Sequence, residues 1–380
     1  MRGRFPGITD GWARLDGPAG TQVVDTAIAA IRRQLADGGS GNTGGFFAAS
    51  DTTAELVMST RAAVGRLLGA DPGGVVFGAN MTTLTFSFTR AVARSLDPGD
   101  EIICTRLDHD ANIAPWVRAA EVAGARVVMA PFDPVTGRLP TEAVTGLLGE
   151  RTRWVAVTGA SNAIGSTPDI GSVVEAAHAA GARVFVDAVH LVPHRRLDVA
   201  ALGCDVLATS AYKWYGPHAG MLWVEPGLLA ALDPDKVRPA TDTGPGRFET
   251  GTPAFEALAG VRAAAEFLPE VDVEREMEVF APMLHGLLAM PHVSVWGPHD
   301  LDDRTPTIAF TVDGHHPDAV AQHLAAARVA VWSGDYYAVE VMATLGLAAG
   351  GGAVRAGIAC YTDSEDVARL LDVVDGLASR

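Results

Sequence analysis

Short apolar runs typical of β-strands alternate with alanine-rich stretches of helical spacing over residues 75–225. The strand runs lie at residues 75–80, 101–106, 126–131, 153–160, 183–188, 206–212 and 220–225. The helical stretches lie at about residues 82–95, 112–122, 141–148 and 169–180. Such alternation predicts an α/β fold, a seven-stranded and mainly parallel sheet with helices on both faces. The last two runs lie close together, which leaves an antiparallel pairing open for them.

A segment rich in proline and glycine, residues 238–253, separates this series from the C-terminal third of the chain. A long helical pattern follows at about residues 254–290, and further strands are predicted near residues 304–312 and 353–361. We therefore expect three parts, an N-terminal segment that packs on the rest, a large α/β domain and a smaller C-terminal α+β domain. Their predicted limits are residues 1–44, 45–250 and 251–380.

The composition, with 48% hydrophobic and 19% charged residues in a chain of 380, is that of a folded globular protein. Twenty-nine basic against 45 acidic residues give a net charge of −16, and no basic run is present. This balance argues against nucleic acid and anionic membranes as partners. Apolar runs such as residues 153–160 fall far short of the ~20 residues of a membrane-spanning helix.

The cysteines and the N-terminal segment bear on the cellular compartment. Cys104, Cys204 and Cys360 are far apart and form no C-x-x-C pair, so neither a disulfide framework nor a zinc site is predicted. The N-terminal segment lacks the apolar core of a secretory signal. We therefore expect a cytoplasmic protein.

Two motifs match a known sequence pattern, but the secondary structure predicted around them does not fit that pattern. Residues 39–44, GSGNTG, match the dinucleotide fingerprint, yet they follow a predicted helix at 25–36 where the fingerprint requires a strand. His190 and His194 have the spacing of metal ligands on a helix, but Pro193 lies between them. We predict no dinucleotide and no metal, and we interpret His194 as a surface or packed residue.

Polar residues follow the carboxyl ends of the predicted strands, the edge at which open α/β sheets bind ligands. They are Asn80, Met81, Thr82, Asp108, His109, Asn112, Ser161, Asn162, Asp187, His190, Ser210 and Lys213. Thr82 opens a helix whose free N–H groups suit a phosphate, although a plain helix cap is an alternative.

Lys213 lies among aromatic residues and glycines directly after an apolar strand. A solvated lysine on a turn is the commoner case. In an apolar pocket, however, such a lysine has a lowered pKa and can form a Schiff base with a carbonyl compound. Together with the Asp187 carboxylate and the helix at Thr82, it supplies the three groups that a pyridoxal phosphate site needs.

Seven segments between residues 75 and 357 carry a more specific signal. They are VVFGANMTTLTF, TRLDHDANIAPW, ASNAIG, VFVDAVH, SAYKWYGPHAG, RFETGTP and VRAG. With these segments the chain resembles the cysteine desulfurase-like proteins of the class V aminotransferase family, which are fold-type I pyridoxal phosphate enzymes. The resemblance implies pyridoxal 5′-phosphate as cofactor, a small amino acid as substrate and a homodimer with its site at the subunit interface.

The resemblance also implies roles around the ring of the cofactor. Lys213 would form the internal aldimine, Asp187 would pair with the pyridine nitrogen, and His109 would stack on the ring. His190 takes the position from which the family contacts the phenolic oxygen, where Gln is usual. Asn162 matches an Asn near that oxygen and the substrate. On this resemblance Lys213, Asp187 and His109 are the catalytic candidates.

The remaining matched residues would hold the phosphate and the substrate. Met81 through its backbone, Thr82 and Ser210 match the phosphate cradle. Thr252 matches a Thr that reaches the phosphate from the second subunit. Arg355 matches the Arg that binds the substrate α-carboxylate.

Two positions depart from the family pattern. Tyr212 stands before Lys213, where many desulfurases have His. Desulfurases attack the substrate sulfur with a Cys on a loop before the final Arg, and residues 329–342 contain none. Cys360 follows Arg355 on a predicted strand, where a small buried hydrophobe is the expected role. We therefore expect sulfur to leave by elimination.

The resulting prediction is a pyridoxal phosphate-dependent enzyme with desulfurase-like C–S cleavage of a small amino acid. An epimerase or an aminotransferase acting at Cα is the alternative within the same chemistry. A binding or regulatory protein that keeps the fold without catalysis is the alternative of another class. The sequence names neither the leaving group nor a sulfur acceptor.

Overall fold

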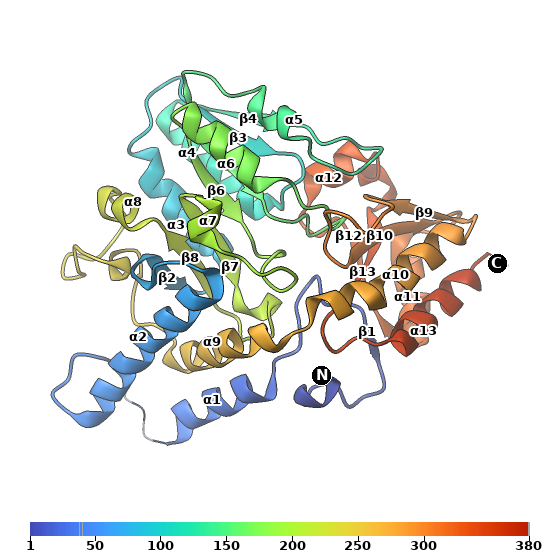
Figure 1. The fold of residues 1–380 in the computed structure, drawn as a ribbon, viewed down its shortest axis with the longest axis horizontal. Coiled ribbons are helices and arrows are strands. Elements are labelled where there is room, and N and C mark those ends of the chain that lie inside the picture. The colour runs from blue at the N-terminus through green and yellow to red at the C-terminus, as the bar shows by residue number, and fades with distance from the viewer. Residues whose placement is uncertain (38, 40, 379–380) are drawn as a thin grey trace.

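A computed structural model describes residues 1–37, 39 and 41–378, and its centre is a seven-stranded sheet (Figure 1). The strands are β2 (Val75–Gly78), β3 (Glu101–Thr105), β4 (Arg126–Ala130), β5 (Thr152–Thr158), β6 (Arg183–Asp187), β7 (Val206–Ser210) and β8 (Gly220–Val224). Their order is β2-β8-β7-β6-β5-β3-β4. The neighbours from β7 to β4 pair in parallel, whereas β8 runs antiparallel to β7 and β2. The predicted sheet and the antiparallel pairing of its last two strands are confirmed.

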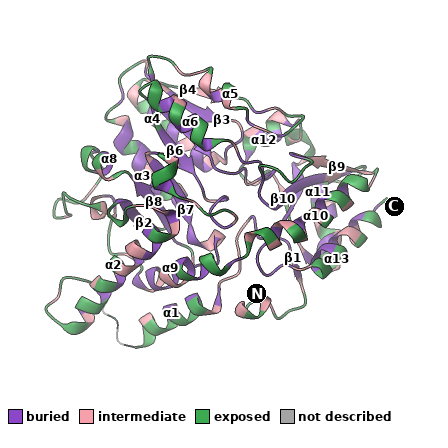
Figure 2. Cartoon of the chain, viewed as in Figure 1, coloured by how far each residue is buried: buried purple, intermediate pink, exposed green. Residues whose placement is uncertain are grey.

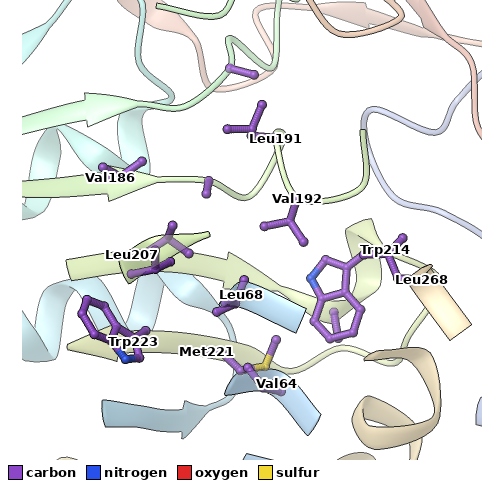
Figure 3. Close-up of a cluster of buried hydrophobic side chains, with 14 of the residues drawn as sticks. Val64, Leu68, Val186, Leu191, Val192, Leu207, Trp214, Met221, Trp223 and Leu268 are labelled. Atoms are coloured by element: carbon purple, nitrogen blue, oxygen red, sulfur yellow. The ribbon is translucent and has the colours of Figure 1, made fainter. Parts of the chain in front are cut away.

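Helices cover both faces of this sheet, because successive residues of its strands enter different cores. On β5, Val155 and Val157 belong to one buried cluster, and Trp154 and Ala156 belong to the other. Helices α2 (Ala48–Leu68) and α6 (Ile170–Ala179) pack into the first cluster, part of which is drawn in Figure 3. Helices α3 (Met81–Ala93) and α4 (Ala114–Ala123) pack into the second.

A second sheet lies in the C-terminal third of the chain. It has four antiparallel strands in the order β12-β13-β10-β9, namely β12 (Trp332–Gly334), β13 (Ala353–Gly357), β10 (Thr307–Val312) and β9 (Val293–Trp296). Helices α10 (Val273–Ala289), α11 (Pro317–Ala326) and α13 (Ser364–Asp375) bury their apolar faces with it in a third core.

The helical pattern predicted at 254–290 forms two helices, α9 (Phe255–Phe267) and α10. A 3₁₀ turn at Leu268–Glu270 separates them, since Pro269 has no N–H to continue the α-helical ladder. Asp272 then caps α10 by accepting a hydrogen bond from the backbone N–H of Arg275. Helix α9 packs beside α1 (Asp25–Ala36) and α2.

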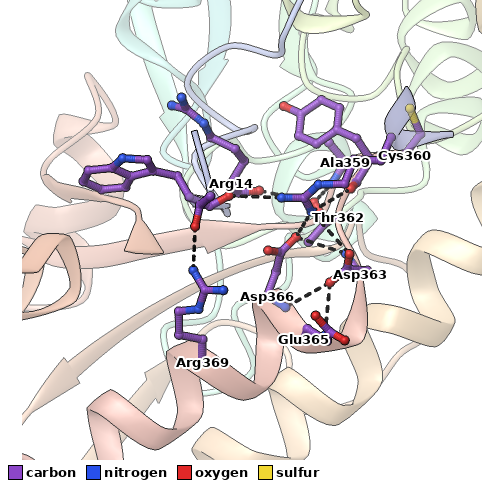
Figure 4. Close-up of polar contacts among 12 residues, drawn as sticks. Arg14, Ala359, Cys360, Thr362, Asp363, Glu365, Asp366 and Arg369 are labelled. Carbon is purple, nitrogen blue, oxygen red and sulfur yellow. Dashed lines mark hydrogen bonds and ion pairs between the residues drawn. The ribbon is translucent and has the colours of Figure 1, made fainter. Parts of the chain in front are cut away.

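The N-terminal segment is tied to the C-terminal third (Figure 4). Strand β1 (Ala13–Arg14) pairs in parallel with β11 (Val329–Ala330). Arg2 forms an ion pair of 2.6 Å with Asp366 of α13, and Arg369 donates to the carbonyl of Gly11 over 2.9 Å. Pro18, which follows β1, lies beside the main sheet, where its carbonyl accepts a hydrogen bond from Lys213.

The remaining helices are short. They are α5 (Thr141–Thr145), α7 (Val199–Leu202), α8 (Pro226–Ala231) and α12 (Val339–Thr344). The outer faces of the helices are exposed, and the strands at the centre of the main sheet are buried, whereas β4, β9 and β12 are mostly half-buried or exposed (Figure 2). None of the helices in the described part of the chain is long and apolar enough to cross a membrane. The predicted domain limits at residues 44 and 250 stay a prediction.

Candidate active site

A pocket lies at the carboxyl ends of the parallel strands, the edge at which open α/β sheets bind ligands. Seven of the residues predicted from the sequence line it, namely Met81, Thr82, His109, Asn162, Asp187, His190 and Lys213. Thr158, Ala160, Val189 and Tyr212 complete the lining. The fold therefore brings together side chains from the ends of β2, β3, β5, β6 and β7.

Lys213 ends the 3₁₀ turn Ala211–Lys213 that follows β7. Its amine donates a hydrogen bond to the carbonyl of Pro18 and lies 5.3 Å from the centre of the Tyr212 ring. Burial of the amine and the nearby positive charge of Arg355 lower the pKa of Lys213 to about 7, while Asp187 opposes this shift. A substantial fraction of this amine is therefore unprotonated and nucleophilic at neutral pH.

Asp187, at the end of β6, is 4% exposed. One of its carboxylate oxygens accepts a hydrogen bond from the backbone N–H of Val189 over 3.0 Å. Burial raises the pKa of Asp187 to about 6, against the effects of this hydrogen bond and of Lys213. A cationic ligand atom beside this carboxylate would be stabilised strongly, because little water competes for either charge.

His109 follows β3 and its ring is fixed by the chain that comes after it. Its Nδ1 accepts a hydrogen bond from the backbone N–H of Ala111 over 2.9 Å, which leaves the proton of the neutral ring on Nε2. Burial and the charges of Lys213 and Arg355 lower the pKa of His109 to about 4, while Asp335 opposes them. The ring is therefore neutral near pH 7, a suitable face for an aromatic ligand.

The N-terminus of α3 forms a polar end of the pocket. Asn80 caps this helix by accepting the backbone N–H of Thr83 over 2.8 Å. The N–H of Met81 donates to Ser210 Oγ over 3.1 Å, so Ser210 joins the cradle although it does not line the pocket. Gly220 of β8 lies against the backbone of Asn80 and Met81, where a side chain would clash. Such a helix start is suited to an anion.

Arg355 reaches the same region from β13 of the second sheet and is 4% exposed. Its Nη1 donates to the carbonyl oxygen of Asn162 over 2.8 Å. Arg355 Nε and Asn162 Oδ1 are buried, and neither has a hydrogen-bond partner among the residues that the structure describes. One unpaired donor and one unpaired acceptor therefore lie close together, which is the condition expected of groups that bind a polar ligand.

Residues 335–338, which we call the strap, are hydrogen-bonded to residues of this region. Tyr336 and Tyr337 both have a φ of 56°. The Asn162 side-chain amide donates to the Tyr336 carbonyl over 3.0 Å, and the Asp110 N–H donates to the Tyr337 carbonyl over 2.7 Å. The Arg355 guanidinium lies 4.3 Å from the centre of the Tyr336 ring. Sequence reasoning missed these tyrosines, since only the absence of a cysteine marked the segment.

Other predicted or candidate residues lie elsewhere. Thr252 is exposed in the loop before α9 and does not line this pocket. Ser333, on β12 before the strap and in the segment where desulfurases carry a loop nucleophile, donates to Asp318 over 2.6 Å and does not line the pocket. The three cysteines are buried, which raises the pKa of Cys104 well above its usual range and those of Cys204 and Cys360 to about 12. None of these thiols is poised as a thiolate nucleophile.

A profile of the class V aminotransferase family matches residues 13–370. The chain belongs to this family. An uncharacterized protein of Mycobacterium tuberculosis (strain CDC 1551 / Oshkosh) is 33% identical over 396 aligned positions, which cover 99% of this chain and 98% of that protein. A cysteine desulfurase of Enterobacter sp. (strain 638) is 34% identical over 72% of this chain and 70% of its own length.

Solved structures agree with this membership. The crystal structure of the cysteine desulfurase CsdA from Escherichia coli superposes with a TM-score of 0.90 at 27% identity, covering 100% of this chain and 97% of that one. An apo cysteine desulfurase from Thermococcus onnurineus gives a TM-score of 0.93 at 24% identity, with the same coverage, and shows the fold. This protein therefore belongs to a family of enzymes. Class V aminotransferases and cysteine desulfurases use pyridoxal phosphate.

Proposed function

We propose that this protein is a pyridoxal phosphate-dependent enzyme that cleaves the C–S bond of a small amino acid by elimination. One observation carries the proposal: Lys213, with a pKa lowered to about 7, shares a pocket with the buried Asp187 at the strand ends. A nucleophilic amine and a carboxylate in one desolvated pocket are the two groups that this cofactor requires.

The residues present fit the cofactor. Lys213 would hold its carbonyl carbon, and Asp187 would hold a proton on its pyridine nitrogen. The neutral His109 ring supplies an aromatic face. The backbone N–H groups at the start of α3, with Thr82 and Ser210, would bind the phosphate. The unpaired Arg355 Nε and Asn162 Oδ1 leave a donor and an acceptor for the amino acid.

The bound cofactor supplies an electron sink that stabilises negative charge at the substrate α-carbon. Lys213 would be the group that removes the α-proton, and its lowered pKa suits a general base at neutral pH. Arg355 orients the substrate through its carboxylate, a geometry matched to the guanidinium fork. The strap, residues 335–338, offers no thiol to accept sulfur.

We further propose that two copies of the chain form the working enzyme. Thr252 is exposed in this chain, as is required of a residue that completes a neighbouring site. Phe46 and Phe47, which precede α2, are also exposed, at 108% and 56%, and a second copy would cover them. Light scattering on the eluting protein measures the mass, and a single monomeric species at micromolar concentration would contradict this part.

Reduction with borohydride tests the central proposal, because the chain has only two lysines, Lys213 and Lys236. After loading with pyridoxal phosphate and reduction, peptide mapping is expected to find the pyridoxyl group on Lys213. Lys236, which pairs with Asp242 over 2.8 Å at the surface, gives a matched control in the Lys236→Arg variant. Labelling of Lys236, or of neither lysine, would overturn the assignment.

Product analysis tests the reaction. The loaded enzyme is incubated with sulfur-containing and other small amino acids in D₂O, and sulfide, keto acid and α-deuteration are measured together. Elimination is expected to release sulfide with loss of the amino acid. Deuteration or racemisation without sulfide would identify the alternative chemistry at Cα, epimerisation or transamination, and refute C–S cleavage.

A further inference from the structure

A chain of buried polar groups runs from the wall of the pocket into the second sheet and α10. His190 lines the pocket and is 4% exposed. Its Nε2 lies 2.9 Å from the Oγ1 of Thr307, the first residue of β10. The ring of His194 lies behind it, with ring centres 5.6 Å apart and an interplanar angle of 71°. The ring of His190 is therefore held from the side opposite the pocket.

Glu276 of α10 continues this chain and is 1% exposed. One carboxylate oxygen lies 2.7 Å from His194 Nδ1, and the other accepts the hydroxyl of Tyr215 over 3.1 Å. The Tyr215 oxygen in turn accepts the backbone N–H of Cys360 over 3.1 Å. A carboxylate buried this deeply needs both partners.

The charged groups that face His190 all act in one direction. Burial comes first, followed by the positive charges of His194, Lys213 and Arg355, and together they lower the pKa of His190 well below its usual range. Asp187 is the carboxylate that shares the pocket, and Thr307 is uncharged. A neutral imidazole carries one N–H donor and one acceptor, so its orientation decides which of them meets a ligand.

We propose that Glu276, His194 and Thr307 are positioning residues that fix the orientation of His190 against the bound cofactor. Thr307 holds the ring from one nitrogen, and His194, whose Nδ1 is held by Glu276, packs edge-on against the ring. The inference rests on the proposed function only for the identity of the group that His190 meets. The hydrogen-bonded groups themselves all belong to this protein, so their arrangement does not depend on the cofactor.

The first test uses Glu276→Gln, which keeps a hydrogen-bonding group of the same shape and removes the charge. His194 then loses the carboxylate that holds its Nδ1, and a change in the ¹⁵N shifts of the neighbouring His190 ring is expected. NMR of histidine-labelled protein without cofactor measures it, with His190 assigned from the His190→Gln spectrum. Glu278→Gln, an exposed change on the same helix, is the matched control.

The second test uses Thr307→Val, which removes the hydroxyl and keeps the shape of the side chain. The ¹⁵N shifts of the His190 ring are expected to move toward a mixture of tautomers, and Thr307→Ser is expected to restore the native shifts. Unchanged His190 shifts in folded Thr307→Val protein, or in folded Glu276→Gln protein, would overturn the positioning role. Thr307→Val keeps the test decisive if Glu276→Gln does not fold.

A third measurement separates this inference from the proposed function. In the loaded enzyme, the pH at which the visible absorption of the cofactor changes is expected to shift in Thr307→Val and to return in Thr307→Ser. Loading at Lys213 with no such shift, although the ring tautomer has changed, would show that His190 does not meet the cofactor. Failure to load any variant or the native protein would contradict the proposed function, while the NMR result without cofactor would still decide the positioning role.

Discussion

Replacement of Arg355 by lysine is expected to weaken the reaction of the loaded enzyme with reagents that carry a carboxylate, and only with those. Arg355 already uses Nη1 on the Asn162 carbonyl, and its Nε is buried without a partner in the described part of the chain. An incoming carboxylate would satisfy that donor. A lysine ammonium at this position cannot serve both the Asn162 carbonyl and the ligand with the same geometry.

The size of the effect follows from the donor that is lost. A hydrogen bond to a charged group contributes about 1.5–3 kcal/mol, which corresponds to roughly a 10- to 150-fold change in rate or affinity. Burial of Arg355, at 4% exposure, places the effect toward the upper part of this range because water replaces the lost donor poorly. The stacking of Arg355 on Tyr336 is also lost, but that contact affects every ligand alike.

The assay needs no knowledge of the natural substrate. Aminooxyacetate and methoxyamine both react with a bound pyridoxal carbonyl, and only the first carries a carboxylate. Arg355→Lys is expected to slow aminooxyacetate by the factor above and to change methoxyamine little. Arg369→Lys, an exposed arginine that donates to the Gly11 carbonyl, serves as control. Equal effects on the two reagents, or none on either, would refute a role of Arg355 in binding carboxylates.

Three further predictions follow from the site. Asp187→Asn should leave the cofactor bound but slow α-proton exchange in D₂O by several orders of magnitude, because a neutral amide cannot keep the pyridine nitrogen protonated; normal exchange by NMR would contradict this role. Because only the unprotonated amine attacks, capture of pyridoxal phosphate by Lys213 should speed up with rising pH and level off above about pH 7. Stopped-flow absorbance measures the rate, and a midpoint near pH 10 would show an ordinary lysine. A folded variant with Cys104, Cys204 and Cys360 all changed to alanine should retain C–S cleavage, and a persulfide found on Cys360 by mass spectrometry would reverse that expectation.

The fold was predictable where the local spacing of apolar residues indicates which positions are buried. The strands of the main sheet are short apolar runs, and each lies within its predicted range except β5, which begins one residue earlier at Thr152. Helix α2 was not predicted, since its threonines and serines blur the apolar stripe that marks a helix in sequence. The pairing of β2 with β8 joins strands that lie far apart in the chain, and no local pattern encodes such a contact.

The candidate site was predictable where it depends on the ends of the parallel strands. Residues that directly follow parallel strands meet at one edge, so Asp187, Lys213 and His109 could be placed together from their positions alone. The residues behind them could not be placed in this way. His194 and Glu276 are 82 positions apart, and their contact depends on how α10 packs against the loop after β6. From the sequence, His194 was a surface or packed residue, and it is packed, with 9% of its side chain exposed.

The strap bears on how sulfur could leave this site. Tyr337 lies over His109, with ring centres 5.6 Å apart, and its backbone is held by Asp110 in a conformation that costs most residues about 1 kcal/mol or more. A segment fastened in this way contains two tyrosines and no thiol. The cysteines of the chain are buried with raised pKa values, so none can replace the missing nucleophile. C–S cleavage here would therefore release sulfide directly, and a sulfur acceptor would have no enzyme-bound persulfide to collect.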